Sequence, residues 1–216
     1  MKERARFLAE CDAVKLEYEE DIAQSGDVIA HVYFPTTGFL SLLRPIEGDN
    51  IEVALAGDEG MFGWPLSVGV KTSNVKALVQ GAGTALRLSP KAFQRQLSQS
   101  ATLRRTIGRY AYVLMTQFAQ TVGCNRFHVV EQRLARWLLM SADRAHSDSF
   151  RVTHEFLANM LGVRRAGVTK AAGQLQNRGL IQYRRGNLDI LDRPGLERAA
   201  CGCYRVNLET YRSVLG

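Results

Sequence analysis

Short apolar segments separated by glycine-containing turns make up the first 88 residues. Partly alternating apolar runs lie at residues 28–34, 38–43, 51–55, 75–79 and 84–88. Glycines recur between or beside them at intervals of 9 to 12 residues, at positions 26, 38, 48, 57, 69 and 81. Evenly spaced short strands with glycine turns are typical of a barrel or sandwich rather than of a parallel α/β sheet.

The pattern becomes helical after residue 88. Ser89 suits a helix N-cap, and Pro90 suits the first helical position. Farther on, apolar or small residues alternate at spacings of four and three, at Leu103, Ile107, Tyr110, Leu114, Gln117, Thr121 and Cys124. This heptad spacing is typical of a coiled-coil seam, and it predicts roughly 33 Å of helix. A helix packed on its own domain is the alternative, but the length favours a dimer with Leu103, Ile107, Tyr110 and Leu114 in the seam.

A second helix is predicted at about residues 129–143, followed by a polar loop at 142–149. The pattern favours a domain boundary at a break between the two helices, near residues 123–127. Beyond the loop, Thr153 is a predicted N-cap, Gly162 allows a tight turn, and Gly179 suits a left-handed C-cap. Two short helices joined at Gly162 form a helix-turn-helix pattern.

The second of these helices has one apolar face and one face of small and basic residues. If Val168, Ala172 and Leu175 point inward, Ala166 and Lys170 point outward. Its N-terminus, where a recognition helix contacts bases, carries two arginines. The candidate DNA-contacting residues in this region are Thr153, Arg164, Arg165, Ala166, Gly167, Thr169 and Lys170. Arginine can bind guanine through two hydrogen bonds. The alternative, a helix whose polar face is only solvated, explains the apolar face but not two arginines beside so many small residues.

Two short apolar runs then flank Gly186-Asn187, which predicts a β-hairpin. A hairpin after a helix-turn-helix is a wing. Arg184 and Arg185 at its tip are therefore expected to contact the phosphate backbone rather than act as ordinary surface arginines.

The charge distribution agrees with a nucleic-acid partner for the second half. The chain of 216 residues has a net charge of +7, but residues 1–88 hold 8 Lys and Arg against 13 Asp and Glu. Residues 89–216 hold the other 20 basic and 8 acidic side chains. A basic domain of this kind is a candidate for binding a polyanion, although some of these charges also solvate helix surfaces.

The order of these elements, and the segment THEFLANMLGVRRAGVTKAAGQLQNRGLI, resemble the Crp/Fnr family of bacterial transcription factors. The resemblance extends over nearly the whole chain. It implies a homodimer on a palindromic site with half-sites about 34 Å apart. Arg165 and Lys170 match two basic positions of the family's recognition helix, whereas Ala166 replaces an acidic residue that reads a base. The resemblance therefore does not imply the family's best-known operator sequence.

The first half resembles the family's cyclic-nucleotide-binding β-roll. Members that bind cyclic nucleotides have Gly-Glu for the ribose and Arg-Ser/Thr for the phosphate. The matching positions here are Gly60-Met61 and Lys71-Thr72. Methionine cannot accept a strong hydrogen bond from a ribose hydroxyl, and lysine lacks the bidentate geometry of arginine. We expect a degenerate effector pocket that binds neither cyclic AMP nor cyclic GMP tightly, and that holds an unknown small molecule or is closed by packing.

The sequence gives little support to a metal site, a set of disulfide bonds or an enzyme activity. Four cysteines are too few for a disulfide scaffold, which fits a reducing cytoplasm. The cysteine set of the family's oxygen sensors is absent, and Cys201-x-Cys203 is one residue tighter than the common zinc knuckle. The four histidines are dispersed, so no metal site or cofactor is predicted. No catalytic motif is present, no secretory signal is evident, and no apolar run approaches the 18 residues of a membrane span.

The sequence therefore predicts an α+β protein with three parts. Residues 1–89 form a jelly-roll-like, cyclic-nucleotide-binding-like β-roll sensor, 90–126 a long dimerisation helix, and 127–216 a winged helix-turn-helix. The predicted function is DNA-binding transcriptional regulation by a homodimer, with double-stranded DNA and an effector as partners and RNA polymerase as a further candidate. The alternative is a dimeric module that binds a ligand or protein and contacts DNA only non-specifically.

Overall fold

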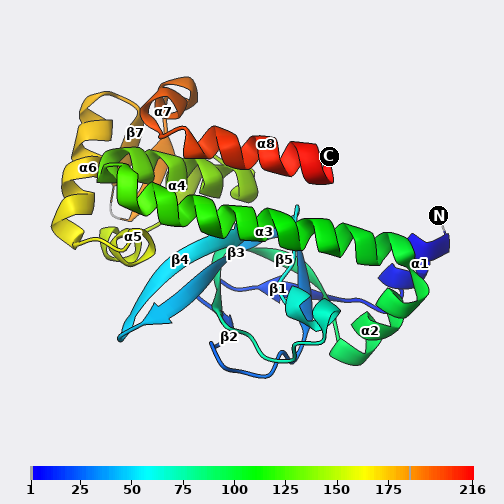
Figure 1. Cartoon of the computed structure of the whole chain (residues 1–216). Coiled ribbons are helices and arrows are strands. Elements are labelled where there is room, and N and C mark those ends of the chain that lie inside the picture. The colour runs from blue at the N-terminus through cyan, green and yellow to red at the C-terminus, as the bar shows by residue number, and fades with distance from the viewer. Residues whose placement is uncertain (1, 185) are drawn as a thin grey trace.

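Five antiparallel strands form the sheet of the N-terminal β-roll in the computed structural model, which describes residues 2–184 and 186–216. They are β1 (Asp12–Leu16), β2 (Asp21–Ala23), β3 (Val32–Ile46), β4 (Asp49–Ala56) and β5 (Lys76–Leu88). Hydrogen-bonded neighbours follow the order β1-β5-β3-β4, and β2 pairs with β5. The predicted mixed fold, with a β-roll before a winged helix-turn-helix, is confirmed (Figure 1).

The long strands β3 and β5 differ from the short ones predicted. Gly38 and Gly81, where turns are predicted, lie inside them. The β3–β5 register shifts between Pro35 and Thr37, between Thr37 and Phe39, and between Phe39 and Leu40. These irregularities bend the strands without ending them, because a bulge adds a residue while the ladder continues on both sides.

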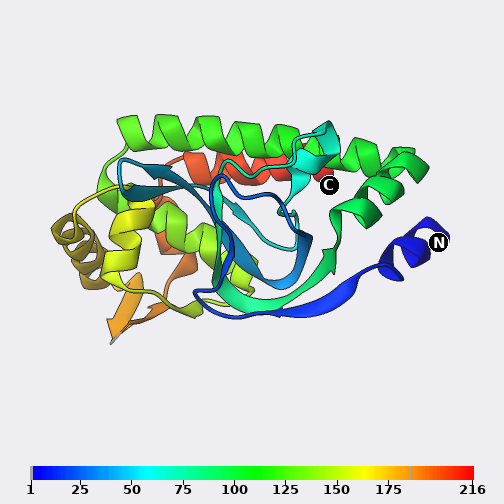
Figure 2. The same ribbon diagram turned by 90° about the horizontal axis from the view of Figure 1, so that it is seen from below.

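The first half also contains the helices α1 (Lys2–Leu8), α2 (Pro90–Gln99) and α3 (Ala101–Phe127), and the 3-10 helix η1 (Trp64–Val68). Ser89 caps α2 as predicted, since its Oγ accepts a hydrogen bond from the Ala92 N–H at 3.2 Å. Helix α3 runs along the molecule, with the β-roll on one side and α8 (Cys203–Leu215) on the other (Figures 1 and 2). It therefore contacts both halves of the chain.

The second half begins with α4 (Val130–Ala145), close to the predicted bounds. Helices α5 (His154–Leu161) and α6 (Arg165–Asn177) follow, and α7 (Arg193–Ala199) precedes α8. Strands β6 (Ser149–Arg151), β7 (Ile181–Arg184) and β8 (Asn187–Ile190) form a sheet in the order β6-β8-β7. None of the helices in the described ranges has the length and hydropathy of a membrane span.

Helix α4 joins the two halves through a shared core. Trp137 and Leu138 of α4 belong to the same buried cluster as Phe39 and Leu55 of the β-roll. The Trp137 indole N–H also donates a hydrogen bond of 2.9 Å to the buried Glu52 carboxyl. Burial raises the pKa of Glu52 to about 7. The contacts between the halves are thus both apolar and polar.

Candidate nucleic-acid interface and effector pocket

Local sequence signals define the helix-turn-helix. The Thr153 side chain caps α5 by accepting a hydrogen bond from the Phe156 N–H at 3.1 Å. Gly162 adopts a φ of 61° and ends α5 in the left-handed conformation. After α6, Gly179 has a φ of 69°, and the Leu180 N–H bonds the Leu175 carbonyl at 3.1 Å. This last bond is that of a Schellman motif, as the predicted C-cap requires.

Helix α6 has the two predicted faces. Its buried residues are Val168, Ala171, Ala172 and Leu175, which include all the positions expected to point inward. The candidate DNA-contacting residues Arg164, Arg165, Ala166, Thr169 and Lys170 are exposed, and Gly167 is half-buried. A Cβ added at Gly167 or Gly173 would have no neighbouring atom within 4 Å. Both glycines therefore border open space, where another molecule could approach the helix backbone.

The basic N-terminus of α6 has the shape and charge of a groove-binding surface. Arg164 occupies the N-cap position, and Arg165 begins the helix. Both side chains can extend from the helix end to base edges, where guanidinium binds guanine O6 and N7. Lys170, one turn farther along, can neutralise a phosphate as a point charge.

Thr169 belongs to a small hydrogen-bond network at the start of α6 that the sequence did not predict. Its hydroxyl donates to the Arg165 carbonyl at 3.1 Å and lies 3.1 Å from Nδ1 of His154. The His154 ring stacks on Tyr183 with a centroid distance of 4.4 Å. Burial and the charge of Arg165 lower the pKa of His154. His154 therefore connects α6 to strand β7. No periodicity marks it, because its partners are 15 and 29 positions away.

The wing differs from the prediction by one residue at its turn. Arg184 pairs with Asn187 in the β7–β8 register, and Gly186 has a φ of 83°. Gly186 therefore lies in the turn, but Asn187 already belongs to the strand, whereas the sequence predicts a turn at Gly186-Asn187. Asn187 is the first residue of β8 because its backbone already pairs with Arg184. Arg184 is exposed at the end of β7. The predicted phosphate contact Arg185 lies outside the described residues.

The predicted dimer seam on α3 is wrong in its choice of face. Ile107, Tyr110 and Leu114 are 0 to 3% exposed and belong to the β-roll core, and Leu103 packs against the same core half-buried. Their own chain covers these side chains, so they cannot form the main contact with a second subunit. The other face of α3 instead exposes apolar side chains, including Tyr112, Met115 and Val122.

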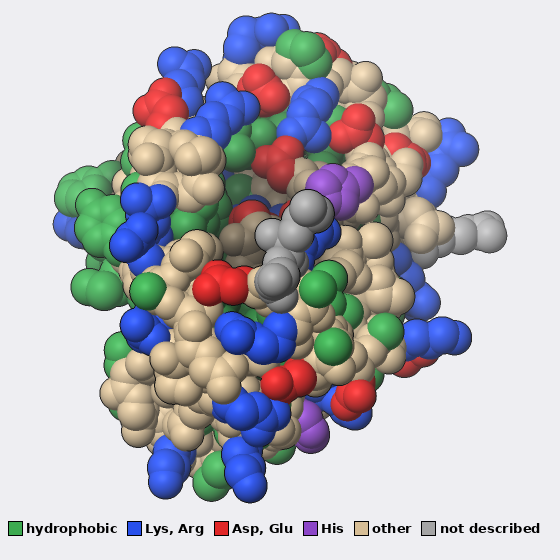
Figure 3. Space-filling view, turned by 90° about the vertical axis from the view of Figure 1, so that its right-hand side faces the viewer, with side chains coloured by type: hydrophobic (Ala, Val, Ile, Leu, Met, Phe, Trp, Pro, Cys, Tyr) green, Lys and Arg blue, Asp and Glu red, His purple; other side chains and the backbone are tan. Residues whose placement is uncertain are grey.

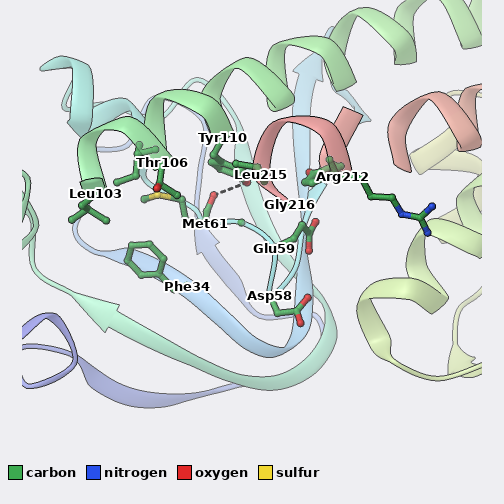
Figure 4. A pocket seen from close by; sticks show the side chains of 13 residues that line it. Phe34, Asp58, Glu59, Met61, Leu103, Thr106, Tyr110, Arg212, Leu215 and Gly216 are labelled. Carbon is green, nitrogen blue, oxygen red and sulfur yellow. Dashed lines mark hydrogen bonds between the residues drawn. The ribbon is translucent and has the colours of Figure 1, made fainter. Parts of the chain in front are cut away.

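Two of the four predicted effector-pocket residues line a cavity. Gly60 and Met61 border a pocket of about 540 Å³, together with side chains of α3 and the C-terminal end of α8 (Figure 4). Lys71 and Thr72 lie elsewhere. The Lys71 carbonyl accepts a hydrogen bond from the Ile29 N–H at 2.8 Å, and Thr72 bridges to Val28. This cavity is therefore lined by the first pair of the degenerate cassette and not by the second.

The charged groups at the pocket are paired or directed away from it. Glu59 pairs with Arg144 at 2.8 Å, and Asp58 lies 3.1 Å from Nε2 of His146. The pocket wall includes these two carboxylates, and the Arg212 guanidinium is directed away from it (Figure 4). The end of the molecule seen in Figure 3 is hollowed near its centre, with acidic side chains beside the hollow. Tyr110 closes the inner wall by donating a hydrogen bond of 3.0 Å to the Met61 carbonyl. A Cβ on Gly60 would lie 2.5 Å from the Tyr110 ring, so this contact requires glycine.

Comparisons with known proteins show one matching domain family and a shared fold. Residues 132–199 match the model of the Crp-like helix-turn-helix domain. FixK2 from Bradyrhizobium japonicum is similar in structure, with a TM-score of 0.74, 14% identity, and coverage of 88% of this chain and 98% of that one. No curated protein sequence matches the chain.

Two further solved structures have the same fold. A CRP-family transcriptional regulator from Thermus thermophilus gives a TM-score of 0.70 at 22% identity, covering 87% of this chain and 96% of that one. The c-di-GMP-responsive global regulator CLP from Xanthomonas campestris gives 0.69 at 19% identity, covering 88% and 98%. The similarity thus includes both the β-roll and the helix-turn-helix.

Proposed function

The chain has the fold of Crp/Fnr regulators and carries a Crp-like helix-turn-helix domain, and we propose that it is a sequence-specific transcriptional regulator that binds palindromic operators as a homodimer. The exposed basic N-terminus of α6 is the observation that carries this proposal. Two of the structurally similar proteins, CLP and the Thermus thermophilus protein, are regulators, which favours a DNA-binding rather than an enzymatic role.

In the proposed complex, α6 enters the major groove with its N-terminus toward the bases. Arg164 and Arg165 then read base edges, and Lys170 and Arg184 contact phosphates, with Arg185 as a further phosphate contact. Ala166 and Gly167 allow the helix backbone to approach the DNA closely. The Thr153 hydroxyl already caps α5, so its role in this complex is to hold the first turn of that helix.

The subunits meet along the exposed face of α3 in this proposal. Tyr112, Met115, Ala119 and Val122 recur at spacings of three, four and three, which is a heptad register. Met115 is 62% and Val122 71% exposed. Burying these side chains against a second copy would remove an apolar stripe from water.

The effector pocket lies where it can influence the dimer helix. Its walls belong to the β-roll, α3 and α8, so a ligand that fits one arrangement of these elements better would shift the population of DNA-binding conformations. The apolar walls favour an uncharged apolar small molecule over a cyclic nucleotide.

Selection from a random DNA pool with purified, ligand-free protein tests the function. A regulator that is competent without a ligand enriches a palindrome with half-sites about one helical turn apart. If only weak, sequence-blind and salt-sensitive binding is found, the selection is repeated with candidate ligands. Sequence-blind binding under all these conditions would contradict the proposal and favour a dimeric interaction module.

A further inference from the structure

Three cysteines and one histidine meet where the two halves of the chain join. One ligand atom from each of Cys124, His128, Cys201 and Cys203 lies within 4.8 Å of all the others. Cys124 is in the last turn of α3, and His128 follows that helix as its C-cap. Cys201 and Cys203 lie at the junction of α7 and α8. The residues form two local pairs, Cys124 with His128 four positions later and Cys201 with Cys203, but 77 positions separate Cys124 from Cys201, so only the fold brings the two pairs together.

The separations match the edges of a tetrahedron around one ion. Sγ of Cys124 and Sγ of Cys201 are 3.5 Å apart, as are Sγ of Cys203 and Nδ1 of His128. A Zn–S bond of about 2.3 Å and tetrahedral angles place neighbouring sulfurs roughly 3.8 Å apart. Because every pair of these ligand atoms lies within 4.8 Å, shifts of at most about 1 Å would be enough to accommodate the ion.

We propose that Cys124, His128, Cys201 and Cys203 bind one zinc ion in a structural Cys₃His site. The three thiols are at most 5% exposed, and His128 closes the fourth side as a half-buried residue. A closed shell of four protein ligands is typical of structural zinc, whereas catalytic zinc keeps a position open for water.

The surroundings stabilise thiolate ligands. Three thiolates and Zn²⁺ would carry a net charge of −1. The buried Arg136 guanidinium donates a hydrogen bond of 3.3 Å to the Thr121 hydroxyl, one turn before Cys124 on α3, which brings a positive charge to this end of the helix. The Gln120 side-chain amide donates a hydrogen bond of 2.9 Å to Sγ of Cys203. Such donors around a metal site orient the ligands and tune their basicity.

Three alternatives to zinc explain the arrangement of these four residues less completely: a disulfide, an iron–sulfur cluster and free thiols. A disulfide between any two of the cysteines would leave the third thiol and His128 without a role. An iron–sulfur cluster distributes its protein ligands over several iron atoms, whereas these four ligand atoms surround one point. Packing of free thiols as small apolar groups does not require an imidazole nitrogen directed at one of them.

The ion would hold together two segments that lie far apart in the chain. It would join the end of α3, with its C-cap His128, to the start of α8, and so anchor the helix-turn-helix half to the long helix. Because the ligands converge only in the folded chain, binding free energy would add to folding stability. Zinc binding of this kind does not depend on DNA binding.

Metal analysis of the full chain, purified without a histidine tag, tests the proposal. We expect one zinc per chain by mass spectrometry of the elements. Cys124→Ser and His128→Gln should lose it. Cys11→Ser and His146→Gln are the matched controls, because Cys11 and His146 lie outside the cluster, and both should keep it.

Cobalt substitution of the wild-type chain provides a test that does not depend on variants that fold poorly. Cobalt added to metal-free protein should give the visible absorption of tetrahedral Co²⁺ and a thiolate charge-transfer band, and one equivalent of zinc should abolish both. Wild-type protein with free thiols and neither zinc nor a cobalt spectrum would overturn the proposal. Three other results would also overturn the proposal. They are bound iron together with sulfide, a disulfide among the three cysteines, and the same zinc content in Cys124→Ser as in Cys11→Ser.

Discussion

His154 is the residue that couples the recognition helix to the wing. Its Nδ1 lies beside the Thr169 hydroxyl, its ring stacks on Tyr183, and its Nε2 is buried without a partner among the described residues. A proton on Nε2 would therefore be buried without an acceptor and close to the charge of Arg165. The neutral ring is favoured in the folded state, in agreement with its lowered pKa.

This lowered pKa predicts a pH dependence of folding. Below about pH 6.5 the unfolded chain binds a proton at His154 more readily than the folded chain does, so stability falls as the pH drops. His154→Gln removes this titration. Denaturant unfolding between about pH 8 and about pH 5 should therefore show a smaller loss of stability in the variant than in the wild type. An equal or larger loss in the variant would contradict the role assigned to His154.

At the scale of elements, α3 shows what a heptad pattern can and cannot predict. The register from Leu103 to Cys124 correctly indicated a long helix with one continuous buried face. It could not identify what covers that face, because an apolar stripe has the same period whether it packs on a sheet or on a second helix. The stripe through Tyr112, Met115 and Val122 has this period too, and only the packing of the β-roll distinguishes the two faces.

The proposed subunit contact predicts the effect of charge on the exposed face. Met115→Lys combined with Val122→Lys should convert the dimer to a monomer, because each lysine would lie opposite its copy in an apolar seam. Val68→Lys is the matched control, since Val68 is 66% exposed on the β-roll rather than on α3. Sedimentation velocity measures the outcome. A dimer that survives the double substitution would place the subunit contact elsewhere.

Local signals predicted most of the helix-turn-helix, because caps and glycine turns act over a few residues. Ser89, Thr153, Gly162 and Gly179 occupy the expected positions. Strand ends in the β-roll were harder to predict, since a glycine marks a turn and a bulge alike. The cluster of Cys124, His128, Cys201 and Cys203 depends on how α3 and α8 pack, which no local pattern contains.

At the scale of the molecule, the two halves are joined closely enough for a signal to pass between them. Helix α4 shares a core with the β-roll, and the turn at Gly162 lies against Ile51 of β4. The recognition helix α6 and the chain termini are at opposite ends (Figure 1). The effector pocket touches α3 and α8, which span the distance between these ends.

The nature of this pocket predicts that cyclic AMP is not the effector. The Arg212 guanidinium is directed away from the cavity, and Lys71 and Thr72 are not among the residues of its wall, so neither that arginine nor that lysine is placed there for the phosphate. Isothermal titration calorimetry with cyclic AMP and cyclic GMP should show no binding in the low-micromolar range. Binding at such concentrations would mean that another site, or a rearranged cassette, receives the nucleotide.

The proposal that the N-terminus of α6 reads DNA bases can be tested by measuring how tightly Arg165→Ala binds the selected operator. Each base pair of the operator is replaced in turn, and binding is measured at two salt concentrations, with Arg4→Ala on α1 as the control. Arg165→Ala should lose about 1–3 kcal/mol of discrimination at one position in each half-site. Uniform weakening across all sequences, with a salt slope reduced by about one, would show that Arg165 contacts only phosphate and would contradict the account.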